Sequence, residues 1–333
     1  MIENKFILSS NKILSLGIAV ADTFAKPINK FPKWNTLDTF SEIKFSAGGC
    51  AVNAAINLKN LGLDVGIAVA IGKDKNGKYI LDELIKKKID TEPLVEKNRI
   101  NTAYTFAMIS SEGKRRYLTN WGANDHFLDT DIKNSVLKKY GLVHLCGTFA
   151  MKSFDGKSTA KFVKRAKKMN LITCMDTIYN DKVNCLALLK SSIPYLDIFF
   201  PSYEEVVQLS GYNSTKKNIE FLKSFKIPIV GIKMGEKGSI VAVNNKTFIC
   251  SPFKVTVTDT SGAGDAFMSG LIYSIVNKSS IEESIIFATA CAALSVGHMG
   301  ANEGIPKPKL VKKFIEKKLN TSNKKKNFIK YFD

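Results

Sequence analysis

Short apolar runs rich in β-branched residues alternate with helical patterns along most of the chain, and this alternation constrains the fold more than any other feature. The expected strands cover residues 13–20, 65–71, 142–146, 171–176, 197–200 and 228–233. Helical patterns lie between most of them, the first at residues 51–62 and the second at residues 77–88. Strands that alternate with helices in this way predict an α/β fold, with a mostly parallel sheet covered by helices on both faces.

Two segments interrupt this alternation and do not resemble crossover helices. Residues 23–45 contain Pro27 and Pro32 and end in alternating residues, whereas residues 101–119 have the pattern of a hairpin with a Ser/Gly turn. We expect the two segments to form a small antiparallel sheet that projects from the main one as a lid. Two ordinary surface excursions are the alternative.

The chain carries a strong positive charge, with 49 Lys and Arg against 30 Asp and Glu and a formal net charge of +19. Such a charge is compatible with nucleic acid, a membrane surface or anionic substrates as partners. The lysines are scattered over expected helical surfaces and gather only in a basic tail at residues 320–333, which we expect to fray. Because no nucleic-acid-binding module accompanies them, a solvated surface without a nucleic-acid partner is the favoured interpretation.

Cysteine usage and the lack of targeting patterns indicate a cytoplasmic protein. The 333 residues are enough for one large α/β domain or two small ones. The six cysteines form no CxxC pair and lie mostly in apolar runs, as buried reduced thiols do. The first residues lack the pattern of a signal peptide, and the apolar runs are shorter than the roughly 18 residues of a membrane-spanning helix. We therefore expect no membrane partner.

Three glycine-containing segments are ambiguous on their own. Residues 72–79, GKDKNGKY, match a phosphate-binding P-loop except that Tyr79 stands where Ser or Thr must bind Mg²⁺, so a plain strand-to-helix connection is favoured. Residues 46–53, SAGGCAVN, place the amide of Asn53 behind two glycines, which suits a ligand hydroxyl or a capped helix equally well. Residues 232–238, IKMGEKG, suit either phosphate contacts through Lys233 or a tight turn.

The strongest local signal is DTSGAGDAF at residues 259–267. Gly262 and Gly264 allow successive N–H groups to converge, and the helix that follows adds the positive end of its dipole. A simple helix cap would explain Asp265 in the first turn, but it would not explain two helix-disfavouring glycines at the same place. The pattern therefore favours an anion-binding turn, and we expect the helix N-terminus to keep Asp265 ionised.

These motifs resemble those of the ribokinase family of sugar and nucleoside kinases, also called the phosphofructokinase-B family. Residues 48–62, GGCAVNAAINLKNLG, resemble its N-terminal signature, and residues 259–267 resemble its C-terminal one. Four more segments lie between them in the family's order: IGKDKNGKYILDEL, WGAN, PSYEE and IKMGEKG. The resemblance covers about residues 13–306 and implies a single doubly wound domain over 1–333. The lid would be formed by about residues 22–46 and 100–122, and it could also carry a homodimer contact.

The resemblance also implies roles for individual residues. Asp265 would be the catalytic base, and the anion hole would be formed by the amides of Gly262, Ala263 and Gly264. Sugar hydroxyls would be bound by Asp22, Gly48, Gly49 and Asn53, with Asp22 at the mouth of the first strand. ATP would lie along Ser202, Lys233, Gly235 and Gly238.

Two metal sites follow from the same resemblance. Glu205 would organise Mg²⁺ through water. A monovalent cation, K⁺ in some family members, would be held by Asp259 with backbone oxygens near Ser295 and Gly300. One departure concerns the ATP end, because the family often has Asn where this chain has Ser202, and serine has a shorter reach.

The function that the resemblance implies is transfer of the γ-phosphoryl group of Mg-ATP to a hydroxyl of a small sugar. The alternative within the family is a nucleoside kinase, whose base would need an aromatic slot to which Phe24, Trp34 or Trp121 could contribute. A basic nucleic-acid-binding protein is the alternative from another class, and a steep salt dependence of binding would distinguish it.

Overall fold

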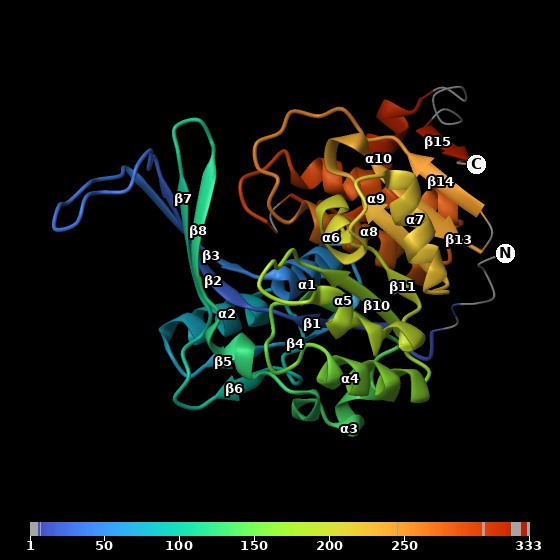
Figure 1. The fold of residues 1–333 in the computed structure, drawn as a ribbon, viewed down its shortest axis with the longest axis horizontal. Coiled ribbons are helices and arrows are strands. Elements are labelled where there is room, and N and C mark those ends of the chain that lie inside the picture. The colour runs from blue at the N-terminus through green and yellow to red at the C-terminus, as the bar shows by residue number, and fades with distance from the viewer. Residues whose placement is uncertain (1–5, 7, 245, 302–303, 321–327, 332–333) are drawn as a thin grey trace.

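A nine-stranded sheet forms the centre of the molecule in the computed structural model, which describes residues 6, 8–244, 246–301, 304–320 and 328–331 (Figure 1). Its strands, in spatial order, are β15 (Ile329–Tyr331), β14 (Lys246–Cys250), β13 (Ser239–Val243), β12 (Ile229–Lys233), β11 (Ile198–Phe199), β10 (Ile172–Thr177), β9 (Leu142–Thr148), β1 (Lys12–Gly17) and β4 (Asp64–Ala68). The six strands from β12 to β4 are parallel, and the three at the other edge are antiparallel. The mostly parallel sheet predicted from the sequence is confirmed.

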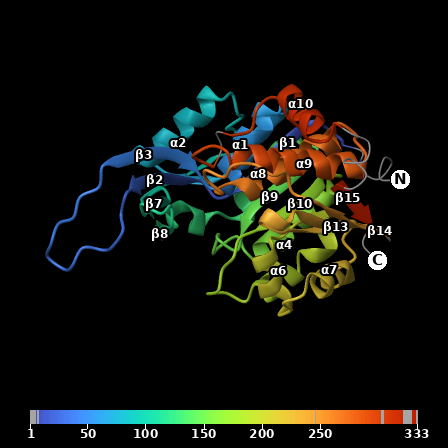
Figure 2. The ribbon, with the colours of Figure 1, turned by 90° about the horizontal axis from the view of Figure 1, so that it is seen from above.

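Helices cover both faces of this sheet, as Figure 2 shows. The helices that pack into one core are α1 (Cys50–Asn60), α2 (Lys75–Lys86), α8 (Ala263–Val276), α9 (Ile281–Ser295) and α10 (Pro308–Lys318). Those that pack into the core on the opposite face are α3 (Asn134–Leu137), α4 (Lys157–Lys168), α5 (Cys185–Lys190), α6 (Tyr203–Ser210) and α7 (Thr215–Ser224). Short 3-10 turns lie at Gly122–His126, Asp129–Asp131, Ile193–Tyr195 and Gly235–Lys237. The molecule is therefore the predicted doubly wound α/β fold.

A second, four-stranded sheet projects from the first and lies at the left of Figure 1. We call it the small sheet; its order is β3 (Glu42–Gly48), β2 (Val20–Lys26), β7 (Tyr104–Ile109) and β8 (Arg115–Asn120). The two outer pairings are antiparallel as predicted, whereas the central pairing of β2 with β7 is parallel. A third pairing joins β5 (Ala70–Gly72) to β6 (Val95–Lys97).

Two predicted strands are each divided in the structure. The apolar run at residues 13–20 was expected to be one strand, but β1 ends at Gly17 and the chain enters the small sheet at Val20. At the break, the backbone N–H of Ala19 donates to Asn124 Oδ1 at 3.1 Å, and Asn124 Nδ2 donates to the Ala19 carbonyl at 3.0 Å. A side chain from a distant segment thus takes the place of a neighbouring strand. The run at residues 65–71 is also divided into two strands, β4 and β5.

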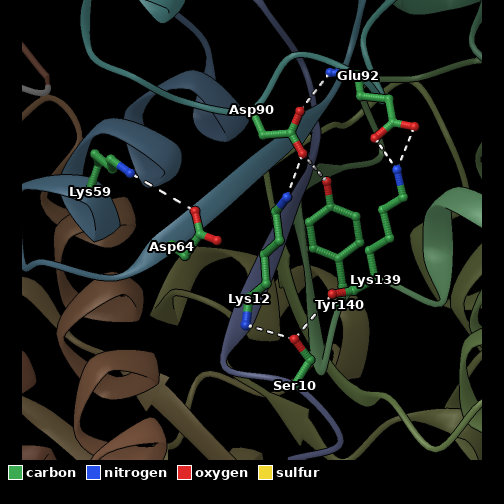
Figure 3. A network of polar contacts seen from close by, with 8 residues as sticks. All are labelled: Ser10, Lys12, Lys59, Asp64, Asp90, Glu92, Lys139 and Tyr140. Carbon is green, nitrogen blue, oxygen red and sulfur yellow. Dashed lines mark hydrogen bonds and ion pairs between the residues drawn. The ribbon is translucent and has the colours of Figure 1, made fainter.

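A polar network closes the amino-terminal edge of the main sheet (Figure 3). Lys12 Nζ, at the start of β1, lies 2.6 Å from Asp90 Oδ2, and the Tyr140 hydroxyl donates to the same oxygen at 3.0 Å. Glu92 and Lys139 form a further ion pair beside them. These contacts join β1 to the segments before β6 and β9. They leave the carboxyl-terminal edge as the place where loops can form a ligand site.

Residues 328–331 of the basic tail are ordered. Residues 321–327 lie outside the described part of the chain, but Phe328 is buried and β15 pairs with β14. The expectation that the tail frays is therefore wrong for residues 328–331, because Phe328 packs on Phe253 and Tyr331 on Phe248. Across the described residues, no helix has the length and apolar character needed to traverse a bilayer.

Candidate active site

A pocket of about 650 Å³ opens at the carboxyl-terminal edge of the main sheet, between the ends of β10 and β12 and the start of α8. Its lining includes these predicted site residues: Ser202, Glu205, Lys233, Gly235, Gly262, Ala263, Gly264 and Asp265. Segments more than fifty residues apart in the sequence therefore meet here. The predicted ATP, magnesium and catalytic positions share one pocket.

Asp265 lies in the first turn of α8 and is 7% exposed. Its Oδ2 accepts a hydrogen bond from Asn53 Nδ2 at 2.9 Å, so α1 fixes the orientation of the carboxylate. Burial, together with the negative charge of Asp176, raises the pKa of Asp265 to about 7, although Asn53 and Lys233 act in the opposite direction. Burial therefore opposes the ionisation of Asp265, which we expected the helix N-terminus to favour.

The glycine turn before α8 is built on a neighbouring loop. Gly262 has φ +72°, and a Cβ at this position would lie 2.2 Å from the carbonyl oxygen of Ala301. No other residue type fits there without displacing that loop. A Cβ on Gly264 would lie 3.4 Å from Lys233 Nζ, so the lysine ammonium reaches the same turn. Backbone N–H groups, a helix N-terminus and a cation therefore surround one point of the pocket.

Asp176 holds Lys233 in place. The Lys233 Nζ is ion-paired with Asp176, at the end of β10, and both side chains are largely buried. Burial opposes the charge on Lys233, but Asp176 and Glu205 raise its pKa. Sequence reasoning missed Asp176 as a site residue. Its position at the carboxyl end of an expected parallel strand was the available signal.

Glu205 belongs to the N-terminal capping box of α6. Its Oε2 accepts from the Ser202 backbone N–H at 2.7 Å and from Thr177 Oγ1 at 2.9 Å. Ser202 Oγ in turn accepts from the Glu205 N–H at 3.3 Å, so this hydroxyl caps the helix at the position where the family often has Asn. Burial and the charge of Asp176 raise the pKa of Glu205 to about 7, against the effect of Lys233.

The predicted sugar-binding residues form a continuous path to Asp265. Asp22 lies within β2 of the small sheet, which corrects the expectation that it follows the first strand of the main sheet. A Cβ on Gly48 would lie 2.0 Å from Asp22 Oδ2, so glycine makes room for this carboxylate. Gly49 then caps α1, which carries Asn53. Burial raises the pKa of Asp22 to about 7.

Gly238 and the aromatic candidates do not line this pocket. Gly238 forms a turn, and a Cβ there would lie 2.0 Å from the carbonyl oxygen of Cys250. Phe24, Trp34 and Trp121 are absent from the described lining, and Trp34 is 96% exposed on a loop of the small sheet. Trp34 thus forms no enclosed slot, whereas Phe24 shares a face of the small sheet with Asp22. Residues 72–79 join β5 to α2, where Asp74 caps the helix through the Gly77 N–H, so the strand-to-helix interpretation is confirmed.

At the predicted monovalent cation site, the Asp259 carboxylate already has partners among the described residues. Asp259 accepts from the N–H groups of Ser261 at 2.7 Å and Gly300 at 3.0 Å, and it forms an ion pair with Arg115 at 2.7 Å. The Ser295 hydroxyl bonds to the Ala292 carbonyl. Gly300 therefore presents its N–H, and not its carbonyl, to the carboxylate. Among the described residues, Arg115 thus supplies the positive charge that K⁺ was expected to bring to Asp259.

Comparison with known proteins agrees with this geometry. The sequence profile described as "pfkB family carbohydrate kinase" matches residues 10–308. The chain is 28% identical over 285 residues to a 5-dehydro-2-deoxygluconokinase of Clostridium botulinum, covering 81% of this chain and 84% of that protein. It is 26% identical over 304 residues to the ribokinase of Staphylococcus aureus, covering 89% and 97%.

Solved structures show the same fold. A ribokinase from Thermotoga maritima has a TM-score of 0.81 at 24% identity, covering 93% of this chain and all of its own. A ribokinase of Arabidopsis thaliana, solved with ribose and ATP, has a TM-score of 0.82 at 23% identity, covering 92% and 99%.

Proposed function

The chain belongs to the pfkB family of carbohydrate kinases, and we propose that it transfers the γ-phosphoryl group of ATP to a hydroxyl of a small sugar, with Asp265 as the base. The observation that carries the proposal is the position of Asp265. It lies between Asn53, on the path to Asp22, and the glycine turn beside Lys233. A group there can face an alcohol on one side and a phosphoryl group on the other.

Asp265 accepts the proton of the attacking hydroxyl as the new O–P bond forms and the bond to the β-phosphate oxygen breaks. ADP leaves with the electron pair of that bond. A pKa of about 7 makes Asp265 a stronger base than an exposed aspartate while leaving much of it ionised near neutrality. The amides of Gly262, Ala263 and Gly264, with Lys233, stabilise the negative charge of the transferring group.

The ATP end of the pocket fits Mg²⁺ bound through substrate phosphates and water. No cluster of three or more His, Cys, Asp or Glu that could hold an ion exists among the described residues. Glu205 and Asp176 nevertheless lie beside the expected phosphates. Mg²⁺ commonly binds through one or two carboxylates together with substrate phosphates, and it would offset the phosphate charge here. Ser202 and Gly235 would lie along the nucleotide, with Lys233 at its phosphates.

A sugar is favoured over a nucleoside as the acceptor. Asp22, Gly48, Gly49 and Asn53 lie beside the pocket of about 650 Å³, outside its described lining, and supply carboxylate, amide and backbone groups that suit hydroxyls. Of the three aromatic candidates for a nucleoside slot, Trp34 is 96% exposed on a loop of the small sheet. The relatives named above act on ribose or on 5-dehydro-2-deoxygluconate, by their names, which also favours a small carbohydrate.

The small sheet would act as the lid of this site and as the contact of a homodimer. Successive residues along each strand of the small sheet point to opposite faces, and one of these faces carries Asp22 and Lys44. The other carries Ile43, Phe45 and Leu118, each more than half exposed. Such an apolar patch on a projecting sheet suits a second copy of the same sheet. ATP as co-substrate and six free cysteines suit the cytoplasm.

An ADP-release screen with Mg-ATP tests the function. The acceptors are pentoses, hexoses, their phosphates, sugar acids and nucleosides, with product identity checked by phosphorus NMR. We expect turnover with at least one free or acidic sugar and none with nucleosides. Turnover confined to nucleosides, or ADP release that is equal with and without every acceptor, would contradict the proposal.

A further inference from the structure

An arginine from the small sheet reaches the turn that forms the anion hole. Arg115 begins β8, and its Nη2 lies 2.7 Å from Asp259 Oδ1. Its other terminal nitrogen donates to Ser261 Oγ. The Arg115 side chain is 18% exposed and that of Asp259 only 2%. Asp259 and Ser261 lie just before Gly262, so this ion pair joins the small sheet directly to the glycine turn.

Asp259 needs a counter-charge at this place. A carboxylate removed from water is costly unless it is paired and hydrogen-bonded. Two backbone N–H groups supply part of this stabilisation, and within the described part of the chain Arg115 brings a full positive charge to the carboxylate. The pKa of Asp259 is lowered, because these hydrogen bonds outweigh burial.

Three carbonyl groups of the loop beside Asp259, those of residues 295–297, already accept hydrogen bonds. The Val296 carbonyl accepts from the N–H groups of Thr258 at 2.7 Å and Asp259 at 3.1 Å. The Gly297 carbonyl accepts from the Thr258 hydroxyl at 3.2 Å, and the Ser295 carbonyl from the His298 N–H at 3.2 Å. A cation bound here would have to compete for oxygens that this chain uses to hold residues 258–262 against residues 295–300.

A second contact from the small sheet ends on the same loops. Lys44, on β3, donates to the Met299 carbonyl at 3.3 Å. Arg115 lies on the face of the small sheet that carries Asp22. In the register of the strands, Asp22 is opposite Thr105, and Thr105 is opposite Thr119. Arg115 precedes Thr119 by four residues on the same strand, so the two side chains are on the same face. The face of the small sheet that carries Asp22, the carboxylate proposed to bind the sugar, is thus the face that contacts the anion-hole turn.

We propose that Arg115 is a positioning residue that replaces a monovalent cation: its guanidinium neutralises Asp259 and fixes the glycine turn to the small sheet. The proposal rests on the kinase function given above. It implies that phosphoryl transfer does not require K⁺, and that closing the small sheet over the sugar and ordering the anion hole are one event.

Cation dependence of four proteins tests this: wild type, Arg115→Ala, Arg115→Lys and the control Arg116→Ala. Arg116 is the next residue on β8, on the opposite face, and packs over Phe31. We expect equal wild-type kcat in potassium, sodium and choline chloride. Arg115→Ala should lose about tenfold or more in kcat, with a smaller change in the KM for ATP. Millimolar guanidinium or K⁺ should restore part of the loss, and Arg116→Ala should behave as wild type.

Two measurements do not depend on turnover. Guanidinium or K⁺ should raise the melting temperature of Arg115→Ala but not of wild type. Amide exchange at residues 258–264 should be faster in Arg115→Ala and close to normal in Arg115→Lys. In a double-mutant cycle with Asp259→Asn, the two losses of melting temperature should be less than additive.

Potassium stimulation of wild type, or an Arg115→Ala protein with normal kcat and no response to cations, would overturn the inference. If wild type phosphorylates no acceptor, the kinase proposal fails on its own, whereas the melting and exchange results still decide whether Arg115 holds the turn.

Discussion

At the scale of single residues, burial controls the chemistry of the pocket. Asp22, Glu205 and Asp265 all have pKa values raised to about 7, and desolvation is the first cause of each. A helix dipole contributes up to about 2 kcal/mol near its end, less than the several kcal/mol that removing a carboxylate from water can cost. The proposed base, Asp265, therefore has a proton affinity suited to neutral pH.

The pH profile should show this. A base must be unprotonated to act, so kcat/KM should fall about tenfold per pH unit below about 7. Stability should change in the other direction. The folded state binds more protons than the unfolded chain between about pH 4 and 7, so the free energy of unfolding rises as the pH falls through that range. Initial rates and urea unfolding across this range measure both, and a rate that is flat down to pH 5 would contradict the assignment.

Replacement of the base separates chemistry from binding. Asp265→Asn should lower kcat by about 10²–10⁴ and leave the Kd for ATP within a few-fold, because the glycine turn and Lys233 remain. The variant should also melt higher than wild type at pH 8, since it no longer buries a charge. Asp155→Asn is the control, as Asp155 is a carboxylate with a raised pKa outside the pocket. Near-normal turnover in Asp265→Asn would remove Asp265 from its role.

At the scale of elements, the passage from β1 to β2 depends on one side chain. Asn124→Ala would leave both polar backbone groups of Ala19 without their partner, at a cost of about 1–3 kcal/mol each. We expect a lower melting temperature and a KM that rises more for the sugar than for ATP, because β2 carries Asp22. Asn124→Asp keeps only the hydrogen-bond acceptor. Its melting temperature and its KM for the sugar should lie between those of wild type and those of Asn124→Ala. An unchanged sugar KM in Asn124→Ala would show that the small sheet is held by other contacts.

The same elements show what sequence reasoning can reach. The parallel strands, α1, α2 and the glycine turn were predictable because each has a local pattern of apolar spacing or of glycines. The end of β1 was not, because the apolar run continues through Ile18 and Ala19, and the group that replaces the missing strand is Asn124. The parallel pairing of β2 with β7 depends likewise on distant segments.

Within the site, the same distinction holds. Asp265, Lys233 and Glu205 lie in recognisable motifs, whereas Asp176 has only its place at a strand end. The partner of Asp259 was missed because Arg115 belongs to a hairpin far away in the chain, with nothing in its own surroundings to mark it. Cation ligands assigned by resemblance were the least secure, since a single arginine changes what the carboxylate needs.

At the scale of the whole molecule, assembly is the property that the small sheet should determine. We expect a dimer by light scattering after size-exclusion chromatography, and a monomer for Phe45→Glu, which places a charge in the exposed apolar face. Leu310→Glu is the control, because Leu310 is 55% exposed on α10, outside the small sheet. A monomeric wild type, or a Phe45→Glu protein that stays dimeric, would contradict the assignment of this face.

The acceptor end and the donor end of the site come from separate segments of the chain, and this has a consequence for how members of the family evolve. In the proposed assignment, acceptor contacts come from residues 22–53, and the phosphoryl-transfer groups come from residues 176–265. Drift or recombination could therefore alter the acceptor while the donor end is inherited unchanged. The Arg115 contact limits this freedom, because an exchanged small sheet would have to bring an arginine at the same place or leave Asp259 to recruit an ion from solution.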